Sequence, residues 1–336
     1  MKYIFLLYMP RSGSTLLAQR LANISDKLLV LPETKFVESL MVHANRSNSA
    51  ETRGQLREII VQDPRWENLG ISAEQLEEVL LEKPTVNVTY IVRRVCELYA
   101  KSRDRNEVIY CVIKNSNSIW SFEKLIKIFG KETTFLHIVR DPRGVASSIL
   151  KGNRAFNRQF TLGVESLGVA KRWRRYIQTV ERIKRRKMNV IEIKYEQFLE
   201  NPERHLTEIS TALNIEGTSA PHETHGLPLS SAENNLHKNV GKPELVNRAE
   251  AWKKELSAFD SYVIERELSE FVDHQKYNRY RDSHMLTLMA ILFSYSNYIR
   301  VACTNKLKLL ARFMFFENGF QSIIYRIKVK ILPYLK

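Results

Sequence analysis

The N-terminal segment passes from an apolar run to a short serine-rich loop and then to a helical pattern, and this transition constrains the fold most. Residues Tyr3–Tyr8 are almost continuously apolar, as in a strand buried on both faces of a parallel sheet. Residues 9–17 read Met-Pro-Arg-Ser-Gly-Ser-Thr-Leu-Leu, and a helical pattern covers Thr15–Asn23. A loop between a strand and a helix N-terminus gathers backbone N–H groups around one point, which favours a bound phosphate or sulfate.

The side chains of this loop strengthen the prediction. Gly13 lets the backbone approach an anion closely, and the hydroxyls of Ser12, Ser14 and Thr15 can donate hydrogen bonds. Arg11 adds a fixed positive charge. The loop is not GxxxxGK[ST], because it lacks the first glycine and the Lys-Ser/Thr pair. The alternative is an ordinary strand-to-helix turn with a Ser/Thr cap.

A second segment has the same character. The predicted strand Thr134–Val139 is followed by Arg140, at the carboxyl end of a strand, where ligands of open α/β sheets bind. Ser148 lies eight residues later, about two turns into the predicted helix Arg143–Leu150, and can reach the same anion. The alternative is a capped helix that follows a surface arginine.

Strand-like and helical runs alternate through much of the chain, which predicts an α/β fold. The further strands are Leu28–Leu31, Val108–Ile113 and Asn189–Ile193, and the further helices include Phe36–Ala44, Ser118–Phe129 and Glu165–Lys187. Residues 47–107 contain helix-like patches and no clear strand, so we expect a helical insertion there. Thr218–Lys242 is a long polar loop of the kind that often binds ligands.

The basic excess narrows the range of partners. Lys and Arg number 52 against 37 Asp and Glu, which gives a formal net charge of +15 and favours an anionic partner. Residues 284–336 contain eight Lys and Arg and one acid, Glu317, among apolar residues at helical spacing. We expect a main domain over 1–283 and a basic helical extension over 284–336. This extension either packs on the main domain or contacts an anionic membrane surface.

Neither of the two longest apolar stretches, Lys2–Tyr8 and Met285–Ile299, reaches the roughly 20 residues of a membrane span, and no cleavage site follows the first. The three cysteines are far apart in the sequence and form no CxxC pair, which argues against a zinc site or a disulfide scaffold. The chain starts directly on its first predicted strand. We therefore expect a cytoplasmic protein, with the extension as the candidate for peripheral contact at the inner face of the membrane.

The loop at 10–17 and the pair Arg140 and Ser148 together resemble the nucleotide sites of sulfotransferases that use 3′-phosphoadenosine 5′-phosphosulfate (PAPS). The resemblance extends to Tyr-Glu-Gln-Phe-Leu-Glu-Asn-Pro at 195–202, and to residues 237–242 followed by Trp252. It implies a P-loop NTPase-like parallel sheet flanked by helices. It also implies that PAPS is the co-substrate and 3′-phosphoadenosine 5′-phosphate (PAP) the product, with no metal required.

The same resemblance implies roles for individual residues. The loop residues Arg11 to Leu16 would bind the 5′-phosphosulfate, and Arg140 with Ser148 would bind the 3′-phosphate. The residues of this first loop are Arg11, Ser12, Gly13, Ser14, Thr15 and Leu16. Tyr195 would lie near the adenine, and Lys238 and Lys242 would belong to a late loop over the nucleotide. The late loop departs from the family pattern, because Gly-Lys-Pro at 241–243 stands where common members read Gly-Asn-Pro with an arginine soon after.

Glu33 is the candidate base. It follows the predicted second strand, one crossover after the phosphate loop, and should return to the same sheet edge. The Glu-Thr pair at 33–34 resembles that of the tyrosylprotein and related sulfotransferases, which implies that Glu33 is the catalytic base. The alternative places Glu33 in the first turn of the next helix, where acids are favourable. His43 and His225 are the second candidates.

Lys114 follows the strand Val108–Ile113, again at the carboxyl edge of the sheet. The resemblance implies that Lys114 stabilises charge on the bridging oxygen as the sulfuryl group leaves; the alternative is a surface lysine. Residues Lys171–Lys187 hold nine Lys and Arg and one acid on a helical pattern. We interpret these charges as a solvated face, with an anionic acceptor along the helix as the alternative.

The resemblance therefore predicts an O-sulfotransferase whose acceptor is a carbohydrate hydroxyl, with a tyrosine or a small-molecule alcohol as alternatives. A P-loop kinase is disfavoured by the missing Lys-Ser/Thr pair and by the absence of an obvious Mg²⁺ aspartate. Nucleic-acid binding would explain the basic charge, but the sequence contains no nucleic-acid motif, so we expect no nucleic-acid partner.

Overall fold

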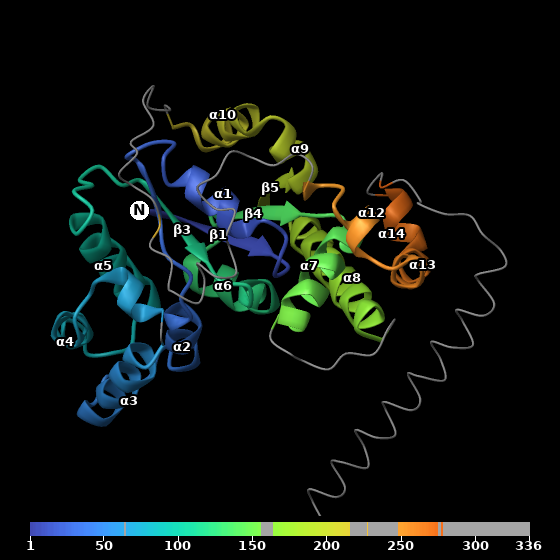
Figure 1. The fold of residues 1–336 in the computed structure, drawn as a ribbon. Coiled ribbons are helices and arrows are strands. Elements are labelled where there is room, and N and C mark those ends of the chain that lie inside the picture. Colours follow the sequence, from blue (N-terminus) through green and yellow to red (C-terminus); the bar gives the residue numbers. More distant parts are fainter. Residues whose placement is uncertain (64, 156–163, 216–226, 228–247, 275–276, 278–336) are drawn as a thin grey trace, which may run out of the picture. The chain divides into compact units, whose positions relative to one another are not determined.

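The computed structural model of the chain describes residues 1–63, 65–155, 164–215, 227, 248–274 and 277 (Figure 1). The chain divides into two compact units, one of residues 1–157 and 169–256 and the other of residues 158–168 and 257–336. The first unit contains the sheet. The predicted extension 284–336, most of the loop 218–242, and with them His225, Lys238 and Lys242, lie outside the described residues.

The sheet has five parallel strands in the order β2-β3-β1-β4-β5. They are β1 (Lys2–Tyr8), β2 (Leu28–Val30), β3 (Tyr110–Lys114), β4 (Thr134–Val139) and β5 (Asn189–Lys194). In register, Leu6 of β1 pairs with Lys114 on one side and Leu136 on the other. Since the strands are parallel, the loop after β1, the end of β3 and the segment after β4 meet at one edge. The five strands predicted from the sequence are confirmed.

The helices of the first unit lie between and after these strands. They are α1 (Ser14–Leu21), α2 (Phe36–Val42), α3 (Ala50–Val61), α4 (Ala73–Leu81), α5 (Val88–Lys101), α6 (Phe122–Phe129), α7 (Pro142–Ala155), α8 (Val164–Arg185, whose first residues belong to the second unit), α9 (Tyr195–Glu200), α10 (Pro202–Leu213) and α12 (Trp252–Glu255), with short 3₁₀ turns η1 (Trp66–Leu69) and η2 (Ser118–Ser121). Helices α3 to α5 occupy the stretch for which the sequence predicts a helical insertion.

Both faces of the sheet are covered, because successive side chains of each strand point to opposite faces. On one face, apolar residues of the strands form a single buried cluster with α1, α9 and α10. On the other face, the ring of Phe129 in α6 contacts Tyr3 and Phe5 edge to face, with centroids 4.9 and 5.2 Å apart. Burial on both faces explains why β1, β2, β3 and β4 are mostly apolar rather than alternating, whereas the edge strand β5 is only partly buried and contains Glu192 and Lys194.

The insertion is a set of capped helices, gathered in Figure 1 on the same side as β3. The side chains of Ser49, Ser72 and Asn87 each accept a backbone N–H bond in the first turn of α3, α4 and α5. In η1 the buried Trp66 packs edge to face on Phe36 of α2, with ring centroids 5.6 Å apart. This contact fastens the insertion to the segment that follows β2.

The two cysteines of the first unit lie closer together than their sequence separation suggests. Cys96 of α5 and Cys111 of β3 are both free and buried, and their Sγ atoms lie 3.1 Å apart. Neither is part of a disulfide in this structure. The separation along the chain alone does not show this contact, because it depends on α5 packing against the sheet.

The second unit contains α13 (Ala258–Glu267) and α14 (Ser269–His274). The hydroxyl of Ser257 caps α13 by accepting from the backbone N–H of Asp260. The buried Asp260 carboxylate in turn accepts hydrogen bonds from the hydroxyls of Ser166 and Ser257. Paired in this way, the buried carboxylate is not left unsatisfied.

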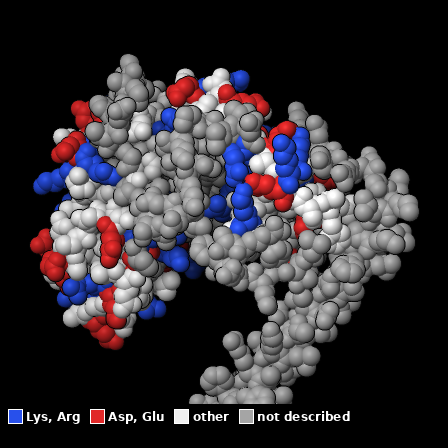
Figure 2. All heavy atoms as spheres, in the orientation of Figure 1, with Lys and Arg blue, Asp and Glu red and all other residues white. Residues whose placement is uncertain are grey.

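Charge on the described surface is mixed. On the face shown in Figure 2, basic and acidic side chains lie next to one another over much of the described surface. No helix among the described residues is long and apolar enough to cross a membrane.

A buried histidine lies within the sheet itself. The imidazole of His137 in β4 is buried, and its Nδ1 lies 3.1 Å from Oε2 of Glu192 in the neighbouring strand β5. Lys184 of α8 donates to the same carboxylate oxygen at 3.1 Å. The hydrogen bond from His137 and the positive charge of Lys184 together outweigh desolvation and lower the pKa of Glu192 to about 2.

Replacing Glu192 by Gln should therefore destabilise the fold at neutral pH by about 1 kcal/mol, a modest value because the partly exposed carboxylate is screened by solvent. A depressed carboxyl pKa adds stability above the unfolded value of 4.5, and this is lost as the pH falls toward 2. Urea unfolding should show that the free energy of unfolding of the wild type exceeds that of the variant at pH 7, and that this difference becomes smaller below about pH 4.5. A difference that stays constant with pH would contradict the ion pair between Glu192 and Lys184.

Candidate functional site

The loop after β1 adopts the conformation that an anion-binding turn requires. The backbone N–H of Ser12 donates to the carbonyl of Met9 at 3.1 Å, which closes a tight turn. Arg11 and Gly13 both have left-handed φ angles, 74° and 90°. Gly13 is the N-cap of α1, and no side chain caps the first turn of that helix. The positive end of α1 therefore faces the turn.

Gly13 is required at its position for two reasons. Its left-handed backbone is strained for any residue with a Cβ. In addition, a Cβ at Gly13 would overlap the ring of Tyr195, the first residue of α9, at Cδ2. The ring of Tyr195 thus packs directly against the loop, and it is this ring that brings the end of β5 to the site.

Cationic groups converge on one side of the loop. Arg11 Nε donates to Ser148 Oγ at 2.9 Å, and Arg140 Nη1 donates to the carbonyl of Arg11 at 2.9 Å. Arg140 Nη2 donates to the carbonyl of Arg248 at 3.2 Å, and its guanidinium lies 4.3 Å from the centroid of the Tyr195 ring. Burial, followed by repulsion from Arg140 and Arg248, lowers the pKa of Arg11. An anion would relieve this repulsion, so the cluster is suited to bind one.

Arg140 is held firmly by its surroundings. The indole N–H of Trp173 in α8 donates to the Arg140 carbonyl at 2.9 Å. A Cβ at Gly144 would lie only 2.9 Å from Arg140 Nε, so the glycine makes room for the guanidinium. That Nε is buried and has no hydrogen-bond partner among the described residues. An unsatisfied charged donor is costly, which again points to a ligand.

The turn between β4 and α7 is fixed by a second, buried arginine. Arg143 donates to the carboxylate of Asp141 through Nε at 2.9 Å and through Nη2 at 2.6 Å. Its guanidinium stacks on the ring of Trp252, 4.0 Å from the centroid. Asp141 also accepts from the backbone N–H of Arg143 at 2.8 Å, so the helix is capped as the alternative expected, but Arg140 before it is buried and is not a surface arginine.

On the other side of the loop, a carboxylate lies between two cations. Lys114 Nζ lies 2.7 Å from Glu33 Oε2 and 3.3 Å from Thr15 Oγ1. Arg65 Nη1 lies 3.2 Å from Glu33 Oε1. Burial by itself raises the pKa of Glu33, but the charges of Lys114 and Arg65 outweigh it and the pKa is lowered overall. Glu33 is therefore ionised at neutral pH and can accept a proton.

The alternative interpretation of Glu33 as a first-turn helix residue is wrong. Helix α2 begins at Phe36 with Lys35 as its N-cap, so Glu33 precedes the helix. Its carboxylate is directed to Lys114 and Arg65 instead. His43, the second candidate, is buried at the C-cap of α2, and no hydrogen bond or ion pair joins it to Glu33 or Lys114 within the described residues.

Two tyrosines, Tyr8 and Tyr176, lie close enough to Glu33 to feel its charge. Burial and the Glu33 charge raise the pKa of Tyr8, whose ring lies 5.6 Å from Lys114 Nζ. Tyr176 of α8 donates to the carbonyl of Ser116 at 2.6 Å, and burial raises its pKa to about 12. Both hydroxyls thus stay protonated at neutral pH and remain hydrogen-bond donors.

The structure joins the two groups of predicted residues through the loop. Arg140, Ser148 and Tyr195 contact one end of it, and Lys114 with Glu33 contacts the other. The buried hydroxyls of Ser12, Ser14 and Thr15 lie between, with Leu16 in the first turn of α1. Lys238 and Lys242 lie outside the described residues, so their contribution stays a prediction.

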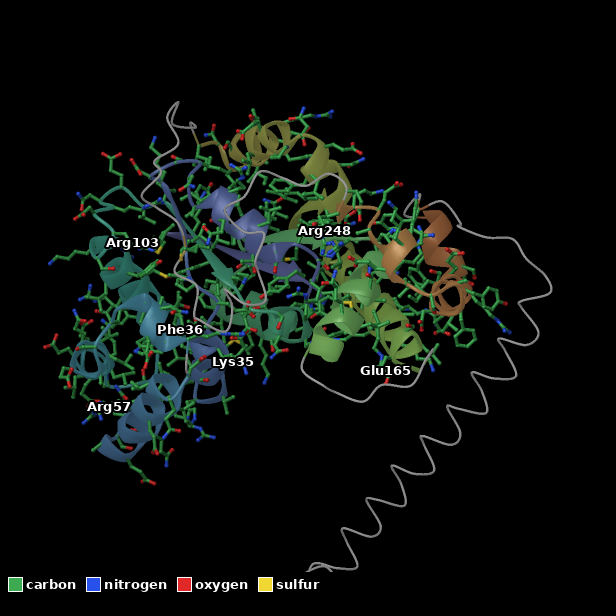
Figure 3. The ribbon with its side chains drawn as sticks, viewed as in Figure 1. Lys35, Phe36, Arg57, Arg103, Glu165 and Arg248 are labelled. Atoms are coloured by element: carbon green, nitrogen blue, oxygen red, sulfur yellow. The ribbon has the colours of Figure 1, made fainter. Side chains whose placement is uncertain are left out.

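Two arginines at this edge are not found by the sequence reasoning. Arg248, labelled in Figure 3, precedes α12, and its carbonyl accepts from Arg140. Arg65 reaches Glu33 from the insertion. Neither lies in a recognisable motif.

Comparison with known proteins gives a consistent result. Residues 4–219 match the profile of the sulfotransferase family. The sulfotransferase domain from the curacin biosynthetic pathway is similar in structure, with a TM-score of 0.58 at 16% identity over 82% of this chain and 98% of that chain. The sulfotransferase domain from the Synechococcus PCC 7002 olefin synthase has a TM-score of 0.54 at 17% identity, over 83% and 95%. At these identities the two structures show a common fold. No curated protein matches the sequence.

Substitution of Gly13 by Ala should destabilise the protein by about 2–4 kcal/mol, because a left-handed alanine is strained and its Cβ would overlap the Tyr195 ring. Gly54→Ala is the matched control, since Gly54 lies inside α3 and a Cβ there would have no other atom within 4 Å; alanine should be neutral or stabilise by about 0.5–1 kcal/mol. Urea denaturation measures both. Equal stability of the Gly13 variant and wild type would show that Tyr195 does not pack on the loop.

Proposed function

We propose, from the premise that this chain belongs to the sulfotransferase family, that it transfers a sulfuryl group from PAPS to an acceptor hydroxyl, with a carbohydrate as the favoured acceptor. The observation that carries the proposal is the position of the phosphate loop between the two groups of side chains. A cationic cluster contacts one end of the loop, and the Lys114–Glu33 pair contacts the other.

The cationic end suits the nucleotide. Arg140, Ser148 and Arg11 would hold the 3′-phosphate, because an unsatisfied guanidinium nitrogen and mutually repelling arginines lie there. The sequence assigns Arg11 to the 5′-phosphosulfate, but its side chain donates to Ser148, which favours a place beside the 3′-phosphate. The backbone N–H groups of the loop and the Thr15 hydroxyl would bind the 5′-phosphosulfate at the N-terminus of α1.

The other end suits the transfer step. An oxygen of Glu33 takes the proton of the acceptor hydroxyl as the acceptor oxygen bonds to sulfur. The bond between sulfur and the bridging phosphate oxygen breaks, and its electron pair leaves with PAP. Lys114, which lies within 3.3 Å of the loop residue Thr15, stabilises the negative charge on that oxygen. Because the sulfuryl group is already anionic, positioning and electrostatics supply most of the acceleration, by analogy with phosphoryl transfer.

The alternatives remain a tyrosine or a small-molecule alcohol as acceptor. The family match rules out a P-loop kinase, in agreement with a loop that has no lysine followed by Ser or Thr. A screen of glycans, tyrosine peptides and simple alcohols with labelled PAPS, with and without EDTA, distinguishes these functions.

PAP should bind and raise the melting temperature, since a ligand at a hundredfold excess over Kd stabilises by about 2.7 kcal/mol. Arg140→Ala should weaken PAP binding by about 10–100-fold, because a charge-assisted bond to phosphate is lost. Arg57→Ala, at an exposed site on α3, is the control and should bind normally. Calorimetry and melting scans that detect no binding to wild type would contradict the proposed function.

Glu33→Gln should lower kcat by about 100-fold or more, since the amide cannot accept a proton, while PAP affinity stays near that of wild type. The lowered pKa of Glu33 in the free protein predicts that wild-type kcat/KM falls on the acid side only below about pH 4.5, the usual carboxyl value. Glu200→Gln, exposed at the end of α9, is the matched control. Near-normal turnover of Glu33→Gln would assign the base to another group.

A further inference from the structure

The cation that reaches Glu33 from the insertion has no role in the transfer step described above. Arg65 Nη1 lies 3.2 Å from Glu33 Oε1, and Lys114 Nζ lies 2.7 Å from Oε2. The two cations differ in access to solvent, because the Lys114 side chain is 4% exposed and that of Arg65 is 36% exposed. The proposed base is thus covered by a buried lysine on one oxygen and by an accessible arginine on the other.

The backbone that carries Arg65 is held in place. The carboxylate of Asp63 accepts from the backbone N–H of Lys35 at 2.8 Å through one oxygen, and from that of Arg65 at 3.0 Å through the other. The next residue, Trp66, is buried against Phe36 at the start of α2, where Figure 3 labels Lys35 and Phe36. These contacts hold the turn with Arg65 next to the segment with Glu33. The fold of the insertion therefore places the guanidinium of Arg65 beside the carboxylate of Glu33.

This arrangement is unfavourable for the reaction of a neutral alcohol. Arg65 is 36% exposed and Glu33 only 15%, so solvent reaches this ion pair chiefly through the arginine. The Arg65 charge makes Glu33 a weaker base, and the guanidinium occupies Oε1, the oxygen that Lys114 does not contact. An acceptor that attracts Arg65 to itself would remove both disadvantages.

We propose that Arg65 selects acceptors that carry a carboxylate beside the reacting hydroxyl, an inference that rests on the proposed function and specifies its acceptor. The guanidinium already binds one carboxylate, that of Glu33, and the carboxylate of the acceptor takes its place. Arg65 then holds the acceptor while Oε1 of Glu33 becomes free to receive the hydroxyl proton. Lys114 stays on the buried side, next to Thr15 of the phosphate loop.

The shape of the arginine side chain makes the prediction specific. A guanidinium is planar and binds a carboxylate through two parallel N–H bonds, whereas a lysine ammonium acts as a point charge. Arg65→Lys should therefore keep part of the preference for carboxylates, and Arg65→Ala should lose it. A purely structural role for Arg65 would lower activity toward charged and neutral acceptors alike.

The test compares acceptors that differ only in charge. The first set is p-nitrophenyl β-D-glucuronide, its methyl ester and p-nitrophenyl β-D-glucoside; the second is 3-hydroxybutanoate and its methyl ester. Labelled PAPS and the full chain give kcat/KM for each, with Arg65→Ala, Arg65→Lys and the control Arg57→Ala on the exposed face of α3 (Figure 3). Calorimetry of the same compounds in the presence of PAP measures binding where turnover is slow.

Wild type should favour the carboxylate over its ester by about 10–100-fold in kcat/KM or in affinity, a ratio that salt reduces. In Arg65→Ala the ratio should fall to near one, in Arg65→Lys it should be intermediate, and in Arg57→Ala it should not change. The proposal is overturned if the wild-type enzyme does not distinguish the acid from its ester in either set of acceptors. This holds whether it sulfates both compounds equally well or binds neither of them. Equal losses for acid and ester in Arg65→Ala overturn it too.

The same experiment separates this inference from the proposed function. If PAP binds and sulfate reaches the esters or the glucoside with no preference for the acids, the transfer reaction stands and the role of Arg65 falls. If PAP does not bind and no acceptor is sulfated, the proposed function itself is contradicted. A melting scan with PAP shows whether the Arg65 variants are folded, and the salt dependence of wild type tests the charge preference without any substitution.

Discussion

The close contact between Gly13 and the ring of Tyr195 is the constraint on which the functional edge depends. Gly13 ends the tight turn after β1, and its lack of a side chain lets the ring reach the backbone. The same ring supports the guanidinium of Arg140 at 4.3 Å. One aromatic side chain from the end of β5 therefore fixes both the loop after β1 and the arginine after β4. The ring acts together with the hydrogen bonds from Arg140 to the Arg11 carbonyl and from Arg11 to Ser148, which join the same two elements.

The edge of the sheet that holds the candidate site reduces the stability of the fold, because positive charges are buried there. Arg140 and Lys114 are buried, and Arg11 is repelled by Arg140 and Arg248. Buried charges are tolerated only when they are paired or hydrogen-bonded. The structure meets this condition in two ways: carbonyl groups and a ring face surround Arg140, whereas a carboxylate faces Lys114. The first arrangement gives Arg140 no ion pair among the described residues, and the second supplies a carboxylate that can take part in chemistry. The two ends of the loop thus differ because their cations are compensated differently.

Much of this edge follows from the sequence, because strand ends in a parallel sheet meet at one side. Lys114 and Arg140 each follow an apolar run, so their positions could be predicted before their contacts were known. Arg65 could not be predicted in the same way, since it depends on how the insertion folds back on the segment after β2. The meeting of Cys96 with Cys111, a helix residue with a strand residue, likewise needs the packing of α5 on the sheet. Periodicity fixes what lies on each element, but contacts between elements distant in the sequence depend on tertiary packing.

The carboxylate of Asp63 links two stretches of chain through a pair of backbone N–H bonds. Lys114 and Arg140, which we propose to contact the leaving group and the nucleotide, stand at the ends of strands and are tied to the sheet. The turn that Asp63 holds lies in an insertion outside the sheet, and it brings Arg65 to Glu33. If Arg65 contacts the acceptor as we propose, substitutions within this turn would change which alcohol the enzyme accepts and leave the strand ends as they are.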